Sequence, residues 1–224
     1  MTEEEAHGHL SEEELKEIAD YIRNNLANMR DEVKLVAFLD HPQRCHYCAD
    51  LKVILDLIEA NSSKVKVEYH MIEEELQKTK EYEVEYAPTV ILEKEGRRNI
   101  RYVGIPGGYE FTVFIETIRN LSNSQTKLSN STKEKLASIN KPVNIKILIT
   151  LSCPYCPLAA RTSNSFAIEN GNVRSEIIDV GEIEEVAIKY DVQAVPKIVI
   201  NESVELLGAQ PENRFIQAVL SALN

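Results

Sequence analysis

Residues 45–48 read Cys-His-Tyr-Cys, and residues 153–156 read Cys-Pro-Tyr-Cys. These two Cys-x-x-Cys motifs contain all four cysteines of the 224-residue chain, so none is left for a structural framework of disulfides. In a reducing compartment such pairs are usually catalytic or metal-binding, because static cross-links do not persist there. The motifs therefore raise two alternatives, a pair of redox centres or a metal site built from four thiolates.

The chain repeats itself at a spacing of 108 residues. Both cysteines and the tyrosine of the first motif recur at this spacing, and Pro88 recurs as Pro196. The first cysteine of each motif therefore lies 43 residues before its proline. Each copy is long enough for a small domain and only two copies exist, so the repeat indicates a duplication and not a solenoid.

A polar stretch at residues 122–132, Ser-Asn-Ser-Gln-Thr-Lys-Leu-Ser-Asn-Ser-Thr, lies between the two copies. Because it is poor in apolar residues, we interpret it as a linker. The sequence thus predicts two domains, 1–121 with the first motif and 122–224 with the second. The alternative is a long surface loop within one domain, in which the two halves remain repeats.

Hydrophobic periodicity predicts the same order of elements in both copies. Capping patterns at Ser11-x-x-Glu14 and Ser131-x-x-Glu134 indicate a helix before each copy's first strand. In the first copy we expect helices over about 11–30, 73–81 and 109–121, a further helix that begins at the cysteines, and strands over about 35–39, 65–70, 89–92 and 99–103. In the second copy we expect helices over about 131–139, 156–169, 182–190 and 212–222, and strands over about 144–150, 174–179, 197–201 and 204–207.

Charge and composition limit the classes of partner. The net charge is −11, so there is no basic field for binding a nucleic-acid backbone. No apolar run approaches the roughly 18 residues that span a bilayer. The N-terminal Met-Thr-Glu-Glu-Glu is acidic where a secretory signal is basic. We therefore expect a cytoplasmic protein that binds neither nucleic acid nor membrane.

The pattern of strand, Cys-x-x-Cys, helix and later strand-preceding proline resembles the thioredoxin superfamily. Two such units in one acidic chain are similar to the protein disulfide oxidoreductases, or glutaredoxin-like proteins, of thermophilic archaea and some bacteria. The resemblance covers nearly the whole chain and includes residues 87–89 (Ala-Pro-Thr), 101–108 (Arg-Tyr-Val-Gly-Ile-Pro-Gly-Gly), 165–170 (Ser-Phe-Ala-Ile-Glu-Asn) and 194–200 (Ala-Val-Pro-Lys-Ile-Val-Ile). It implies an α/β fold of two tandem thioredoxin-like units, each a mainly four-stranded mixed sheet flanked by helices.

Two features depart from the wider superfamily. The chain contains no Trp, so the Trp that precedes the cysteines of ordinary thioredoxins is absent. Gly208-Ala209 stands where glutathione-binding glutaredoxins show a Gly-Gly turn. This second departure weakens the expectation that glutathione is used.

The position of each motif at a helix start suits thiol chemistry. Disulfide exchange needs a thiolate, and an unperturbed cysteine with a pKa of about 8.5 is mostly protonated at neutral pH. A helix N-terminus favours an anion through its unpaired N–H groups and its dipole. We therefore assign Cys45 and Cys153 as exposed nucleophiles, and Cys48 and Cys156 as more buried resolving thiols. The resemblance implies that the pairs close as the disulfides Cys45–Cys48 and Cys153–Cys156.

The residues between the cysteines are expected to adjust each centre. A positive charge on His46 would stabilise the Cys45 thiolate, and the alternative is a solvated residue at the helix start. Pro154 fits the first turn of a helix, because it has no N–H to lose there. Tyr47 and Tyr155 are expected to cover their disulfides.

The resemblance also gives roles to the two recurring prolines. Pro88 and Pro196 should follow cis peptide bonds and leave the preceding backbone free to pair with an extended substrate segment. The alternative is a trans proline at the start of a strand.

The implied function is a protein dithiol–disulfide oxidoreductase that maintains cytosolic redox state. It would act as a reductase, with oxidase and isomerase activity open, because these share the same residues. Implied partners are protein disulfide substrates, a thioredoxin-reductase-type flavoenzyme as electron donor, and a peroxiredoxin; no cofactor is expected. The alternative from another class is a structural or adaptor module with a four-cysteine zinc site. Its pairs normally lie about 15 to 20 residues apart, whereas 104 residues separate Cys48 from Cys153.

Overall fold

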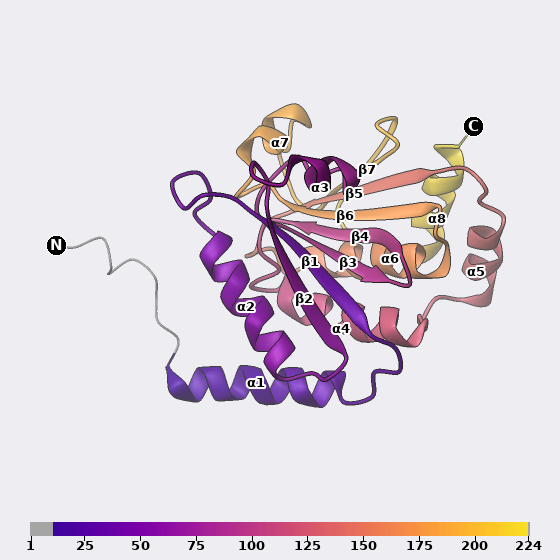
Figure 1. The fold of residues 1–224 in the computed structure, drawn as a ribbon. Coiled ribbons are helices and arrows are strands. Elements are labelled where there is room, and N and C mark those ends of the chain that lie inside the picture. Colours follow the sequence, from indigo (N-terminus) through magenta and orange to yellow (C-terminus); the bar gives the residue numbers. More distant parts are fainter. Residues whose placement is uncertain (1–10, 224) are drawn as a thin grey trace.

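One eight-stranded sheet runs through both copies of the repeat in the computed structural model (Figure 1). The structure describes residues 11–223, so the acidic N-terminal run lies outside the described residues. The strand order is β2-β1-β3-β4-β6-β5-β7-β8. The strands are β1 (Val33–Leu39), β2 (Val65–Met71), β3 (Thr89–Lys94), β4 (Arg97–Val103), β5 (Val143–Ile149), β6 (Val173–Asp179), β7 (Lys197–Ile200) and β8 (Val204–Leu207).

The helices follow the order expected from the sequence in both copies. They are α1 (Glu12–Leu26), α2 (Cys48–Ala60), α3 (Leu76–Glu81), α4 (Glu110–Asn123), α5 (Asn130–Ala137), α6 (Cys156–Glu169), α7 (Glu184–Lys189) and α8 (Glu212–Ser221). The largest differences are at α1, which ends four residues before the expected position 30, and at α3, which begins three residues after position 73. Among the described residues no helix is long and apolar enough to cross a bilayer.

Each copy contributes four neighbouring strands, as the fold class predicted. Within a copy the first two strands are parallel and the others antiparallel. The two halves are joined by a parallel pairing of β4 with β6, from Ile100 opposite Ser175 to Val103 opposite Ile178. The second unit therefore continues the sheet of the first.

Helices cover the two faces of the sheet unequally. Successive side chains of a strand point to opposite faces, so each strand contributes side chains to two cores, one on each face of the sheet. Leu35 of β1 joins the large core shared with α1, α2, α4, α5, α6 and α8, whereas Val36 joins a smaller core under Tyr82, just after α3. In the second copy, Ile177 faces the large core and Ile178 packs with Val186 of α7. Both helices that begin at a cysteine motif thus lie on the same face.

Both motifs also lie at the same end of the strands, where β1 and β5 finish. β1 and β5 run in the same direction, because the chain of pairings between them contains two antiparallel and two parallel steps. Each motif follows the carboxyl end of one of these strands. At about 4.8 Å per step, the four steps separate the two strands by about 19 Å.

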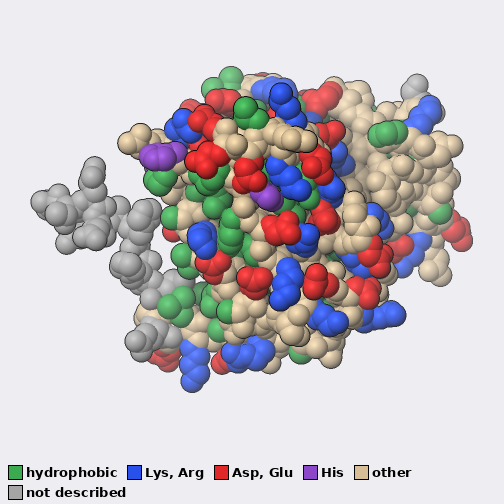
Figure 2. All heavy atoms as spheres, in the orientation of Figure 1, with side chains coloured by type: hydrophobic (Ala, Val, Ile, Leu, Met, Phe, Trp, Pro, Cys, Tyr) green, Lys and Arg blue, Asp and Glu red, His purple; other side chains and the backbone are tan. Residues whose placement is uncertain are grey.

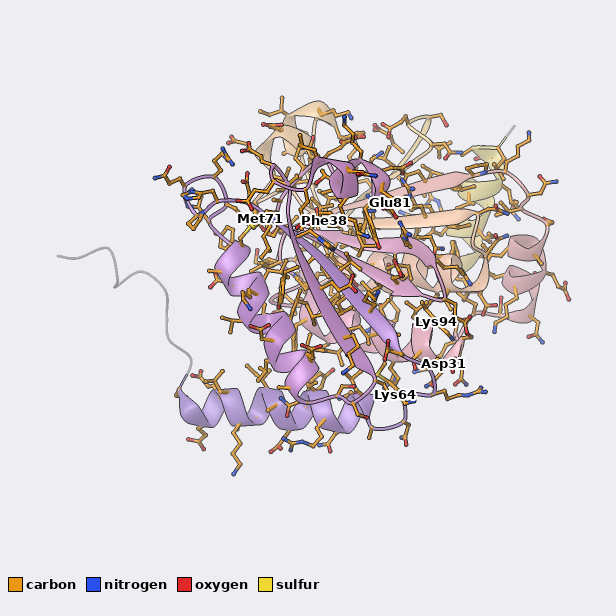
Figure 3. All side chains as sticks on the ribbon, viewed as in Figure 1. Asp31, Phe38, Lys64, Met71, Glu81 and Lys94 are labelled. Carbon is orange, nitrogen blue, oxygen red and sulfur yellow. A yellow bond between two sulfur atoms is a disulfide. The ribbon has the colours of Figure 1, made fainter. Side chains whose placement is uncertain are left out.

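The stretch predicted as a linker is shorter than expected. α4 continues to Asn123, and the buried hydroxyl of Ser122 donates to the carbonyl oxygen of Asp31 over 2.6 Å. The Lys94 ammonium lies 2.7 Å from the Asp31 carboxylate and donates to the Ser122 carbonyl oxygen over 2.9 Å, and Figure 3 shows Asp31 and Lys94 close together. α5 begins at Asn130, so residues 124–129 alone connect the helices. The domain boundary near residue 122 stays a prediction about folding units.

The surface drawn in Figure 2 carries acidic and basic side chains interspersed with one another. Several form exposed ion pairs, such as Lys52 with Asp56 and Arg23 with Asp20. Such pairs contribute little to stability, because solvent screens them. Because the two signs of charge are mixed, the face drawn in Figure 2 shows no single acidic patch.

Candidate active site

The first motif connects β1 to α2. Cys48 is the first residue of the helix, and Cys45 lies in the preceding turn. The two sulfurs form a disulfide, with the Cα atoms 5.5 Å apart. The backbone N–H of Asp40 donates to Cys48 Sγ over 3.3 Å. Leu51, Leu55 and Ile58 fix the helix by packing one face into the large core.

The second motif repeats this arrangement between β5 and α6. Cys153 and Cys156 form a disulfide, again with Cα atoms 5.5 Å apart. The N–H of Cys156, in the first turn of the helix, donates to Cys153 Sγ over 3.2 Å. An N–H at a helix start stabilises negative charge on the atom that accepts from it. When the disulfide opens, this contact favours a thiolate at Cys153.

Both recurring prolines follow cis peptide bonds, Ala87–Pro88 and Val195–Pro196. This agrees with the isomer that the resemblance implied. The sulfur of Cys153 lies 3.8 Å from the carbonyl oxygen of Val195, so the cis-proline loop borders the second disulfide. Their use in binding substrate remains a proposal.

The expected difference in exposure within each pair is wrong for the first centre. Cys45 and Cys48 expose 5% and 6% of their surface, so the predicted nucleophile is no more open than its partner. At the second centre Cys153 exposes 8% and Cys156 exposes none. Tertiary packing covers the cysteines of each motif, whereas the two residues between them are exposed. A substrate therefore meets little exposed surface on the cysteines themselves.

The side chains between the cysteines point outward. Tyr47 and Tyr155 expose 42% and 66% of their surface. These rings are available to a partner, and their expected covering of the disulfides stays a prediction. His46 is also exposed, and its effect on Cys45 stays a prediction.

Pro154 does not occupy the position that the sequence predicted for it. Because α6 begins at Cys156, Pro154 lies in the turn before the helix. Pro157 takes the first-turn position instead. A proline fits there because the N–H groups of the first turn have no partner within the helix.

Two acidic side chains near the carboxyl ends of β1 and β5 were not singled out by the sequence. Glu110 begins α4, is fully buried, and has no hydrogen-bond partner for either carboxyl oxygen among the described residues. Burial raises the pKa of Glu110 to about 7. The preceding residue, Tyr109, donates its N–H to the carbonyl oxygen of Leu151 over 3.2 Å, two residues before Cys153. Burial also raises the pKa of Glu182, in the connection from β6 to α7, to about 7.

No local signal in the sequence distinguishes these two acids among the 36 acidic residues of the chain. An acidic residue in the first turn of a helix is common, since it complements the helix dipole. Glu110 therefore looks like an ordinary helix start. A carboxyl with a pKa near 7 can exchange protons at neutral pH. Glu110 and Glu182 are therefore candidates for a role in thiol chemistry.

The zinc alternative finds no support. The four cysteines form two separate disulfides, which follow strands that lie about 19 Å apart. Within residues 11–223 there is no cluster of three or more His, Cys, Asp or Glu side chains that could hold a metal ion. A single four-thiolate site would require the two motifs to meet, and the continuous sheet holds them apart.

Comparisons with known proteins point to one fold family. Residues 143–221 match the thioredoxin domain family. The chain is 37% identical over 82 residues to a thioredoxin of Methanocaldococcus jannaschii, in a match that covers 36% of this chain and 96% of that protein. It is 29% identical over 118 residues to the F component of the alkyl hydroperoxide reductase of Pseudomonas putida, covering 52% of this chain. The match spans only 23% of that longer protein.

A solved structure matches almost the whole chain. The protein disulfide oxidoreductase from Aeropyrum pernix K1 superimposes with a TM-score of 0.85 and 34% identity, over 96% of this chain and 94% of that one. The match therefore includes both units and the sheet that joins them. Together with the two disulfides and the two cis prolines, this near full-length likeness shows that the chain belongs to the thioredoxin-fold protein disulfide oxidoreductases.

Proposed function

We propose that the protein exchanges dithiols and disulfides with protein substrates. The observation that carries this proposal is that each Cys-x-x-Cys disulfide lies at the amino end of a helix, in a unit that also has a cis proline. A helix start stabilises a thiolate, which is the attacking form in exchange. At the second centre Cys153 is the more exposed cysteine of its pair, which favours attack there.

The proposed reaction has two exchange steps. The thiolate of Cys45 or Cys153 attacks a substrate disulfide, forms a mixed disulfide and releases one substrate thiolate, which takes up a proton. The thiolate of Cys48 or Cys156 then attacks the mixed disulfide and releases the second substrate thiolate. The substrate gains two electrons and two protons, and the protein is left with a disulfide. Both steps reverse when a more oxidising disulfide is supplied.

The two cis-proline loops are proposed to bind the substrate. The backbone before Pro88 or Pro196 would pair with an extended segment of the substrate, and the exposed rings of Tyr47 and Tyr155 would contact its flanks. Main-chain pairing recognises extended polypeptide without selecting a sequence. Varied protein disulfides would therefore be accepted.

The proposed cellular setting is the cytoplasm, with a thioredoxin-reductase-type flavoenzyme as electron donor and a peroxiredoxin among the partners. The likeness to part of an alkyl hydroperoxide reductase component supports a place in peroxide metabolism. No bound cofactor is needed for either exchange step, because thiols and disulfides carry the electrons.

Reduction of insulin by dithiothreitol tests the function directly. We expect the wild type to accelerate the reaction, and the variant with all four cysteines changed to serine to give only the rate of dithiothreitol alone. The two intermediate variants, Cys45→Ser/Cys48→Ser and Cys153→Ser/Cys156→Ser, show which centre reacts with insulin. Serine is the matched replacement, since it keeps the side-chain size but cannot form a disulfide.

The proposal fails if the four-serine variant accelerates the reaction as much as the wild type. It also fails if the wild type gives no acceleration while its two disulfides are reduced and reoxidised normally. Bound zinc is assayed in the same samples, and about one zinc per chain in the reduced wild type would favour the metal-site module.

A further inference from the structure

The two cis-proline loops are built alike but have different surroundings. Gly104 donates its N–H to the carbonyl oxygen of Pro88, and Gly208 donates to that of Pro196, each over 2.8 Å. A Cβ atom at Gly208 would meet nothing within 4 Å. A Cβ at Gly104 would lie 2.9 Å from both Asp179 Cβ and Glu182 Oε2. The segment bonded to Pro88 is thus packed against the second unit at Gly104, whereas the space beside Gly208 is open.

Glu182 makes the specific contact between the units at this point. Its Oε2 accepts a hydrogen bond from the N–H of Ile105 over 3.1 Å. Ile105 directly follows Gly104, so a side chain of the second unit holds the segment that is bonded to Pro88. Among the described residues the corresponding N–H of Ala209 donates to no side chain, unlike that of Ile105.

We infer that Glu182 of the second unit is a positioning residue for the first centre, holding the Pro88 loop in place for an extended polypeptide substrate. This inference rests on the proposed function, because it assigns the loop to substrate binding. A hydrogen bond to an ionised carboxylate is about twice as strong as one between neutral groups. The loop is therefore held most firmly when Glu182 carries its charge.

The surroundings of Glu182 place its ionisation near neutral pH. Burial raises its pKa to about 7, and the nearby carboxylates of Asp179, at the end of β6, and Asp50, in the first turn of α2, act in the same direction. The hydrogen bond from the Ile105 N–H lowers the pKa of Glu182, because it favours the ionised carboxylate. As the pH rises through about 7, Glu182 ionises and its bond to Ile105 strengthens. The first centre should then bind polypeptides better, and the second centre should not change in this way.

The test uses proteins with one working centre each. Cys153→Ser/Cys156→Ser leaves the first centre, and Cys45→Ser/Cys48→Ser leaves the second. Each prereduced protein reacts once with insulin or with 2-hydroxyethyl disulfide, and the second-order rate constants are measured from pH 6 to 8.5. The small neutral disulfide has no peptide backbone to pair with the loop. The ratio of the two rate constants removes the titration of the attacking thiol, which both reactions share.

In the first-centre protein, Glu182→Ala should lower the rate constant with insulin about tenfold, equivalent to about 1.4 kcal/mol, and leave the rate constant with the small disulfide unchanged. Glu182→Gln keeps an acceptor for Ile105 but cannot ionise. It should therefore abolish the rise of the rate ratio near pH 7 while it keeps the low-pH ratio. Glu184→Gln, at an exposed acid two residues along the chain, is the matched control and should behave as the parent.

Three results would overturn the inference. One is an equal loss with both substrates, which indicates general damage to the centre. Another is an equal loss in the second-centre protein. A third is an unaltered pH dependence of the ratio in Glu182→Gln. If the first-centre protein with Glu182 intact oxidises with 2-hydroxyethyl disulfide but never with insulin, the proposed function fails at this centre, and the inference falls with it.

Discussion

Burial of the Glu110 side chain makes the stability of the folded protein depend on pH. Its ordinary pKa of 4.5 rises to about 7 in the folded protein, mainly through burial, with Asp179 adding to the rise and Arg161 opposing it. Between these values the unfolded chain loses the proton that the folded chain keeps. The contribution of Glu110 to stability is therefore fully present below pH 4.5, falls between pH 4.5 and 7, and levels off above. The fall due to this group is about 3 kcal/mol.

Glu110→Gln should remove this contribution, because glutamine cannot ionise. We expect the free energy of unfolding of the variant, relative to the wild type, to be higher at pH 8 than at pH 5 by about 2.5 kcal/mol. Urea unfolding at the two pH values measures the difference. Glu134→Gln, at an exposed acid in α5, is the control and should give the same value at both. An equal effect of Glu110→Gln at both pH values would show that Glu110 is ionised in the folded protein throughout.

At the scale of the element, α5 illustrates how a helix start depends on distant residues. The sequence pattern predicted Ser131 as the cap, but the structure has Ser129, whose hydroxyl oxygen accepts from the N–H of Thr132 over 3.3 Å. The Glu212 carboxylate, from α8, accepts from both the N–H and the hydroxyl of Ser129. The acid that completes the cap thus comes from another helix.

Ser129→Ala should lower the free energy of unfolding by about 1 kcal/mol, because it removes the cap and its link to α8. Ser131→Ala is the matched control, since Ser131 is exposed and lies within the first turn of α5. Guanidinium unfolding of the two variants beside the wild type measures the costs. A larger loss for Ser131→Ala than for Ser129→Ala would restore the cap that the sequence pattern suggested.

At the scale of the whole molecule, the two units share more than a strand pairing. The side-chain amide of Asn99 in β4 donates to the carbonyl oxygens of Ala167 and Val173, over 2.8 and 2.7 Å. On the face that carries α3 and α7, a cleft of about 680 Å³ is crossed by ion pairs between the units, with 2.5 Å between Arg174 and Glu83. We therefore expect the two repeats to unfold together.

Denaturant unfolding should show one cooperative transition, with the protected amides of β1 and β5 exchanging hydrogen at the same free energy. Asn99→Ala removes the side-chain donor of the Val173 carbonyl oxygen and leaves the Ala167 carbonyl oxygen with Arg97 as its side-chain donor. It should lower stability by about 2 kcal/mol in both units alike. Hydrogen exchange followed by mass spectrometry compares the units within one sample. Two separate transitions, or a loss confined to the first unit, would instead support independent domains on either side of residue 122.

Patterns among residues close together in the chain were enough to locate the helices, the strands and the reactive thiols. The 108-residue repeat placed each cysteine motif at a strand-to-helix junction, and hydrophobic periodicity located all eight strands, because both signals depend on residues close together in the chain. The 43-residue offset from each motif was sufficient to single out Pro88 and Pro196 among the eight prolines of the chain.

Only the tertiary structure decided how the units meet and what surrounds each centre. Pairing of β4 with β6 has no local signal, since any exposed strand edge offers the same N–H and C=O groups. Glu110 and Glu182 each lie against residues of the other unit, Glu110 near Arg161 and Glu182 bonded to Ile105. Burial is set by contacts between segments far apart in the chain, and a carboxyl acquires a pKa near 7 only after those contacts remove it from water.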